Sequence, residues 1–169
     1  FLNKGLKIHF HDERDGKDNE FYYEGGIVSF LKYLSENKKT LHAEPIYIQR
    51  EKDDGFLELA LMYNDGYNEE IFSFVNNVNT RDGGTHLSGF RSALTRTVNS
   101  YAMQSKMLKN GEISLTGEDV REGLIAVLSI KIPEPQFEGQ TKGKLGNTEV
   151  KGMVEQIIND QLGKLFEEQ

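Results

Sequence analysis

Apolar residues alternate with polar ones at the start of the chain, as they do on a strand with one buried face. Leu6, Ile8 and Phe10 occupy every second position. The charged segment that follows contains Asp15-Gly16, a dipeptide typical of a tight turn. The chain is therefore expected to return as a second strand at residues 21–23 and to form a hairpin.

Apolar residues recur with the helical period in three further segments. One helix is expected to follow Gly25-Gly26, and a longer one to run from about Thr85 to Met107. The last helix starts at Asn147 or Thr148, because either residue can accept a hydrogen bond from the first helical turn. Residues 116–119 (TGED) predict a capping box for a short helix, with Asp in place of the usual Glu or Gln.

Four apolar runs between these helices predict the strands of a sheet. Residues 45–50, 56–63 and 70–78 are separated by short connections, so they are expected to be antiparallel neighbours. Residues 124–132 are apolar at nearly every position, which is typical of a central strand, and Pro133 ends the run. The order of elements predicts an α/β fold in which helices pack against a mostly mixed sheet.

The composition limits the chain to a small number of classes. Its 169 residues, 37% of them hydrophobic, suffice for one domain or for one domain with a small remnant of another. Cysteine is absent, which excludes disulfides and thiolate zinc sites and fits a cytoplasmic protein. No stretch approaches the ~20 apolar residues of a membrane span. Because the chain begins without Met at Phe1, inside an apolar stretch, we interpret it as a piece of a longer protein.

The charge of the chain bears on any contact with nucleic acid. The formal net charge is −7, whereas a protein dedicated to nucleic acid usually carries a surplus of Lys and Arg. A contact with DNA therefore requires a local basic patch on an otherwise acidic molecule.

Residues with metal-binding or catalytic chemistry do not form a recognisable constellation. His9 and His11 are spaced to lie on one face of the first strand, but no third ligand is near them in the sequence. Two histidines on a strand surface are the favoured interpretation, and no metal site is predicted. The G-x-S-x-G and H-E-x-x-H motifs of hydrolases and metalloproteases are also absent.

Two glycine-rich polar segments have compositions that packing does not explain. In residues 76–89, Gly83-Gly84 precedes a helix start, where free amides can bind an anion; a plain turn with Thr85 as helix cap is the favoured alternative. Residues 136–147 carry Lys142 and Lys144 between glycines. A phosphate contact and a solvated surface loop are equally compatible with this pattern, which lacks the spacing of a P-loop.

Several of these segments, in order along nearly the whole chain, resemble one family. The most specific are YYEGGIVSFLKYLS, SFVNNVNTRDGGTHLSGFRSALTR, LTGEDVREGL and PQFEGQTKGKLGN. In these segments the chain is similar to the B subunits of bacterial type IIA DNA topoisomerases, that is, of DNA gyrase and topoisomerase IV.

The resemblance implies a division into two parts. Residues 1–20 correspond to the last strand or strands of a GHKL nucleotide-binding domain, none of whose nucleotide-binding motifs is present. Residues 21–169 correspond to the transducer domain. The implied fold is α/β (α+β): a split βαβ arrangement like that of a ribosomal-protein domain, with a mixed sheet and helices on one side.

The resemblance also implies roles for three residues. Gln140 and Lys142 match a loop that reaches into the ATP site of the neighbouring domain, where Lys142 contacts the γ-phosphate and Gln140 assists. Arg91 matches an arginine that lines the cavity through which a DNA duplex passes. Lys144 and the GGTH segment receive no role.

Cofactors and partners follow from the same resemblance. ATP and Mg²⁺ belong to the full-length protein, and neither is expected on this chain alone. The expected partners are the GHKL domain of the same chain, a second B subunit, the gyrase A subunit and double-stranded DNA. Three alternatives stay open: topoisomerase IV instead of gyrase, the middle domain of a mismatch-repair ATPase or heat-shock chaperone, and a stand-alone nucleic-acid-binding module.

Overall fold

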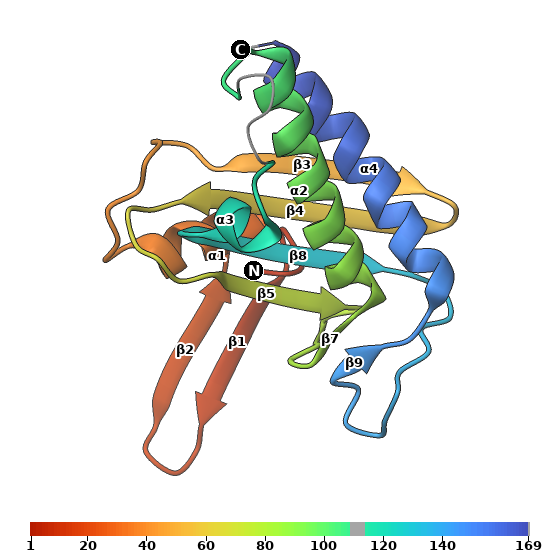
Figure 1. Ribbon diagram of the computed structural model, residues 1–169. Helices are drawn as coiled ribbons and strands as arrows, with labels where there is room; N and C mark the ends of the chain where they lie inside the picture. Colours follow the sequence, from red (N-terminus) through yellow and green to blue (C-terminus); the bar gives the residue numbers. More distant parts are fainter. Residues whose placement is uncertain (109–113, 169) are drawn as a thin grey trace.

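A computed structural model describes residues 1–108 and 114–168 (Figure 1). Its main sheet has five strands in the order β3-β4-β8-β5-β6. The bounds of these strands are Ile46–Lys52 (β3), Gly55–Tyr63 (β4), Glu70–Val75 (β5), Val78–Asn79 (β6) and Leu124–Lys131 (β8). Within this sheet, neighbouring strands are antiparallel except β5 and β8, which are parallel. The predicted mixed α/β class is therefore confirmed.

Strand β8 lies at the centre of the sheet, as its apolar composition predicts. It separates β4 from β5, so the prediction that these two strands are paired neighbours is wrong. The reason is that β8 is buried on both faces from Leu124 to Ile130, and only a central place gives it a neighbour on each side. The resemblance implies a split βαβ unit, in which another strand lies between the two parallel strands. In the unit β5-α2-β8 the two parallel strands are instead bonded directly to each other.

Helices cover both faces of the sheet. Their bounds are Gly26–Ser35 (α1), Thr85–Gln104 (α2), Gly117–Arg121 (α3) and Thr148–Glu167 (α4). Helices α2 and α4 pack on one face, and Figure 1 shows them side by side in front of the sheet. Helix α1 packs on the opposite face through Ile27 and Leu31, so the prediction of helices on one side is wrong for α1. The physical reason is that the alternate residues Met62, Ile125 and Val127 are also apolar and need a cover.

The ends of the predicted helices are largely confirmed. Thr116 caps α3 with the expected capping box, since its hydroxyl accepts from the Asp119 amide (3.1 Å) and Asp119 Oδ2 accepts from the Thr116 amide (2.8 Å). Helix α2 ends at Gln104, earlier than predicted, because Lys106 takes a left-handed backbone conformation (φ 55°). In the described ranges, no helix is long and apolar enough to cross a membrane.

The predicted N-terminal hairpin is present and forms a sheet of its own. It consists of β1 (Lys7–Asp12) and β2 (Lys17–Tyr22) and extends away from the main sheet (Figure 1). Its apolar face is uncovered, with Ile8 and Phe10 50% and 52% exposed. A third, very short sheet pairs β7 (Gly83–Gly84) with β9 (Lys144–Leu145) in parallel.

Candidate functional site

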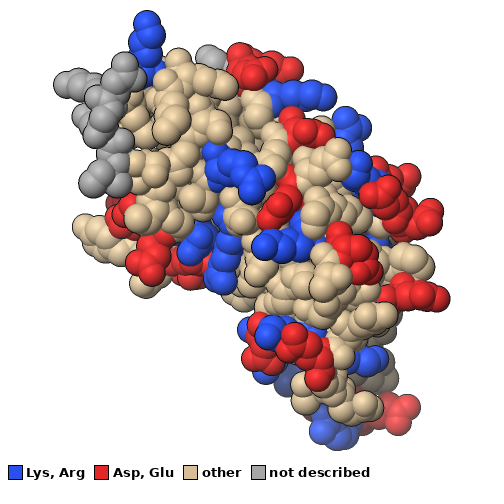
Figure 2. Space-filling view, turned by 45° about the vertical axis from the view of Figure 1, so that its right-hand side comes forward, with Lys and Arg blue, Asp and Glu red and all other residues tan. Residues whose placement is uncertain are grey.

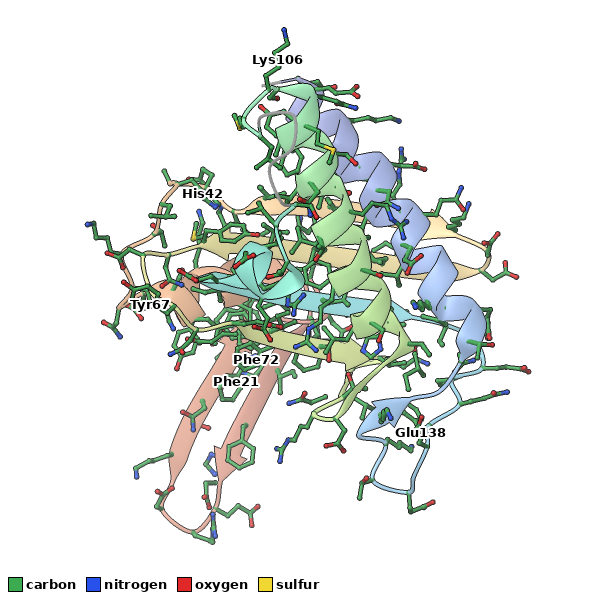
Figure 3. All side chains as sticks on the ribbon, viewed as in Figure 1. Phe21, His42, Tyr67, Phe72, Lys106 and Glu138 are labelled. Carbon is green, nitrogen blue, oxygen red and sulfur yellow. The ribbon has the colours of Figure 1, made fainter. Side chains whose placement is uncertain are left out.

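The glycine-rich segment 136–146 folds back on itself as a hairpin, which we call the lysine hairpin. The Gly146 amide donates to the Gln136 carbonyl (2.7 Å), and the Glu138 amide donates to the Lys144 carbonyl (2.9 Å). Lys144 also forms an ion pair with Glu138 (3.1 Å) across the hairpin, which gives this lysine a structural contact. Figure 3 shows Glu138 on this hairpin, away from the body of the sheet.

Lys142 lies at the tip of the lysine hairpin. Its amide donates to the Gly139 carbonyl (3.0 Å) and closes the terminal turn. Its backbone is left-handed (φ 54°). This conformation is rare for residues other than glycine, and where it occurs it is often found at functional sites. The side chain is exposed, as is that of Gln140, and the ammonium has no ion pair with any described residue. The tip therefore presents an uncompensated cation to solvent.

Asn147 closes the base of the lysine hairpin. Its Oδ1 accepts from the Gln136 amide (2.6 Å), and its Nδ2 donates to the Glu134 carbonyl (3.1 Å) and to Glu149 Oε1 (2.8 Å). Asn147 occupies the residue before α4, as predicted, but its side chain makes no capping hydrogen bond. The amide instead bridges the two ends of the hairpin while only 4% exposed.

The two glycine-rich segments of the sequence lie against each other. The Asp82 amide donates to the Gly143 carbonyl (2.9 Å). Directly after this bond, Gly83-Gly84 pairs with Lys144-Leu145 as strands β7 and β9. The segment 82–84 therefore contacts the returning arm of the lysine hairpin one residue beyond Lys142. Sequence patterns gave no indication of this contact.

The first turn of α2 is fixed to the main sheet by a buried polar network. His86 Nε2 bonds Thr80 Oγ1 (2.9 Å), and Thr80 Oγ1 donates to the Ser73 carbonyl on β5 (2.9 Å). If the Thr80 hydroxyl proton goes to the Ser73 carbonyl, the bond to Thr80 is made by the neutral tautomer of His86 that donates from Nε2. Burial lowers the pKa of His86 to about 4. The prediction that Thr85 caps α2 is wrong, because Gly84 occupies the cap position and makes no side-chain bond.

Arg91 projects from α2 into an ion-pair cluster. Its Nε donates to Glu69 Oε1 (2.8 Å), and Arg121 Nε of α3 donates to Glu69 Oε2 (2.9 Å). Burial raises the pKa of Glu69, but hydrogen bonds from Arg121 and Arg91 outweigh it and hold the pKa below its usual value. The Arg91 side chain is still 43% exposed. It therefore reaches solvent while the helix stays docked.

An open cavity of about 750 Å³ adjoins the start of α2 and the lysine hairpin. Its charged lining is Arg81, Asp82, Arg91, Glu138, Lys144 and Lys151. Four cations thus face two carboxylates in a molecule whose net charge is −7. Figure 2 shows basic and acidic side chains interspersed on the side of α4, so the basic character is local.

The two histidines of the first strand pair with different carboxylates. His11 Nδ1 lies 2.7 Å from Asp18 Oδ1, and His9 Nε2 lies 3.3 Å from Glu20 Oε2. Within residues 1–108 and 114–168, no three His, Cys, Asp or Glu side chains gather as a metal site would require. That the chain binds no metal stays a prediction.

Comparison with known proteins bears directly on this arrangement. The family model described as DNA gyrase B matches residues 26–169. The chain is 55% identical to the DNA gyrase B protein of Myxococcus xanthus over 168 residues, and 56% identical to that of Clostridium acetobutylicum over 169 residues. In both cases 99% of the chain is covered.

The chain belongs to the DNA gyrase B family. It spans only 21% and 26% of the length of these two gyrase B relatives. The fold matches the 43K ATPase domain of Thermus thermophilus gyrase B, solved in complex with an aminocoumarin, with a TM-score of 0.87 and 41% identity. It also matches the ATP-binding domain of Francisella tularensis topoisomerase IV, with a TM-score of 0.82 and 27% identity.

These matches extend over less than half of each solved gyrase B or topoisomerase IV structure. In both cases the match covers 99% of this chain but only 45% of the solved chain. The family and the α/β class expected from the sequence are thereby confirmed. The roles of Gln140, Lys142 and Arg91 stay predictions.

Proposed function

We propose that this chain is the transducer domain of a DNA gyrase B protein. It couples ATP binding and hydrolysis in an adjacent GHKL domain to closure of the dimer gate and to DNA strand passage during supercoiling. The observation that carries the proposal is the uncompensated ammonium of Lys142, held at the tip of a hairpin that projects from the domain. The division into residues 1–20 and residues 21–169 is part of the proposal.

Lys142 is suited to read the state of a nucleotide. An ammonium forms strong hydrogen bonds with a phosphate oxygen, and Gln140 lies in the same terminal turn to assist. ATP and Mg²⁺ are held by the GHKL domain of the full-length protein. Hydrolysis and phosphate release remove the partner of Lys142. The arrangement of the two domains that ATP stabilises is then no longer favoured, and the population of molecules shifts to the other arrangement.

The remaining parts of the domain transmit this change. Helices α2 and α4 pack along each other over the sheet, so a displacement of the hairpin base at Asn147 reaches α4 directly. Helix α4 then carries the signal toward the DNA-cleavage core, which includes the gyrase A subunit. The assembly requires a second B subunit and acts on double-stranded DNA in the cytoplasm.

The uncovered face of the N-terminal hairpin supports the proposed domain division. Ile8, Phe10 and Phe21 are 44–52% exposed on strands that do not join the main sheet. An apolar strand face of this kind needs a cover, and the GHKL domain is the proposed one. The hairpin extends to Tyr22, two residues beyond the proposed boundary.

The proposal is tested by separating the two domains. We expect the isolated chain to hydrolyse no ATP, because the nucleotide-binding motifs of the GHKL class are missing from it. A longer protein that includes the preceding GHKL domain is expected to turn ATP over in the same steady-state assay. Turnover by the isolated chain, with contaminating ATPases excluded by mutation, would contradict the proposal.

A second expectation concerns the contact with DNA. In the full-length enzyme, Arg91→Gln is expected to weaken DNA-stimulated ATPase more than basal ATPase, because Arg91 faces a locally basic cavity and phosphate contacts are salt-sensitive. Arg96→Gln is the matched control, since Arg96 lies on the same helix, is 59% exposed and forms a long ion pair with Glu155 (4.0 Å). Equal loss of both activities in Arg91→Gln would instead assign Arg91 a structural role with Glu69.

A further inference from the structure

We propose that the segment Asp82–Gly84, whose role the sequence leaves open, is the positioning element for Lys142. It fixes the returning arm of the lysine hairpin and thereby the place of the ammonium. This inference rests on the proposed function, because it explains how Lys142 is held for contact with a nucleotide phosphate.

The contact between the two segments is made by backbone atoms. The Asp82 amide donates to the carbonyl of Gly143, the residue that follows Lys142. Pairing then continues from Gly84 to Leu145, whose side chain is 1% exposed in the core. The arm is therefore attached on one side to the segment 82–84 and on the other to the packed interior.

Gly84 permits this approach because it has no side chain. Its φ is 133°, a conformation that L side chains rarely adopt. A Cβ at this position would lie 2.5 Å from both the backbone nitrogen and the backbone oxygen of Leu145. Neither atom is the end of a flexible side chain, so a larger residue must push β9 away from β7.

The segment is itself held rigidly at its other end. The Gly83 amide donates to the Thr80 carbonyl (3.0 Å). Thr80 and His86, both buried, link the start of α2 to Ser73 on β5. A force on the lysine hairpin is therefore transmitted to α2 and the main sheet instead of being absorbed by a loose turn.

These contacts also bear on the anion-site interpretation of the glycine-rich segment 76–89. The amides of Asp82 and Gly83 donate to carbonyls within the chain. These two amides are therefore not free to bind an anion before α2.

The test uses Gly84→Ala in the full-length enzyme. We expect kcat for ATP to fall on the order of ten- to a hundredfold, because a displacement of about 1 Å is enough to cause such a loss. Binding of a non-hydrolysable ATP analogue is expected to change far less. Gly152→Ala is the matched control: Gly152 lies in α4 with no heavy atom within 4 Å of an added Cβ, so turnover should not change.

A double-mutant cycle distinguishes positioning from a general structural effect. If Gly84 acts through Lys142, the variant carrying both Gly84→Ala and Lys142→Ala is expected to be no slower than Lys142→Ala alone. Losses that multiply would overturn the inference. Normal turnover in Gly84→Ala together with impaired Lys142→Ala would also overturn it, whereas normal turnover in Lys142→Ala would instead remove the proposed function.

A second pair of variants keeps the test decisive if Gly84→Ala melts below the assay temperature. Asp82→Pro removes the amide that donates to Gly143, whereas Asp82→Ala keeps it. We expect Asp82→Pro to lose several-fold more kcat than Asp82→Ala, with thermal unfolding measured on both. Equal turnover in the two variants would overturn the inference.

Discussion

Replacing Lys142 with alanine in the full-length enzyme is expected to lower ATP turnover on the order of ten- to a hundredfold. A hydrogen bond to a charged group contributes roughly 1.5–3 kcal/mol, and about 1.4 kcal/mol corresponds to a tenfold change. The domain should remain folded, because the side chain is exposed and its loss creates no cavity. If the contact tightens in the transition state, most of the loss falls on kcat and little on KM.

Lys144→Ala is the matched control for this experiment. Lys144 lies on the same hairpin, but its ammonium is paired with Glu138 instead of being uncompensated. Nucleotide binding, steady-state ATPase and thermal unfolding should be measured on both variants. A Lys142→Ala variant with normal turnover removes Lys142 from the mechanism, and one that melts far below wild type assigns it a structural role.

Mild acid is expected to destabilise the chain through His86. Burial lowers the pKa of this imidazole from 6.5 to about 4, so the unfolded chain binds a proton at a pH where the folded chain does not. The contribution to the free energy of unfolding is complete above pH 6.5 and is lost as the pH falls toward 4. Between about pH 7.5 and about pH 5 the loss is about 2 kcal/mol.

The variant His86→Gln isolates this effect from the titration of other groups. Its side-chain amide does not titrate and retains an N–H donor for Thr80 Oγ1, the partner of His86 Nε2. Urea unfolding at several pH values should show a flatter pH dependence for this variant than for wild type, with the difference confined to the window between the two pKa values. Parallel curves would show that the pKa of His86 does not differ between the folded and the unfolded chain.

The sequence predicts the strands of the sheet better than their neighbours. Residues 124–132 are recognisable as a central strand because both faces are apolar, and burial of both faces is a local property. Which strands lie beside β8 depends on the path of the chain through α2, which no pattern within β4 or β5 records. The face that α1 covers is likewise not recorded in its own sequence, since its apolar stripe fits either face.

Some residues of the candidate site can be recognised in the sequence, whereas others are recognised only from the fold. Lys142 and Arg91 were found only through long motifs, because a lysine between glycines is equally typical of a solvated loop. Glu69 was missed altogether: it pairs with arginines 22 and 52 residues away, and beside Glu70 it has the pattern of a solvated acidic pair. Asn147 was recognised as a helix start, whereas its bonds to Glu134 and Gln136 follow only from the folded hairpin.

The central place of β8 has a consequence for the order in which the chain acquires its structure. In the folded sheet β3 pairs with β4 and β5 with β6, but the two pairs are joined only through Leu124–Lys131, which is synthesised after them. A nascent chain that ends before Leu124 therefore exposes two unpaired, apolar strand edges, the feature that makes partly folded chains aggregate. The sheet must close in one late step, when its last strand enters the middle.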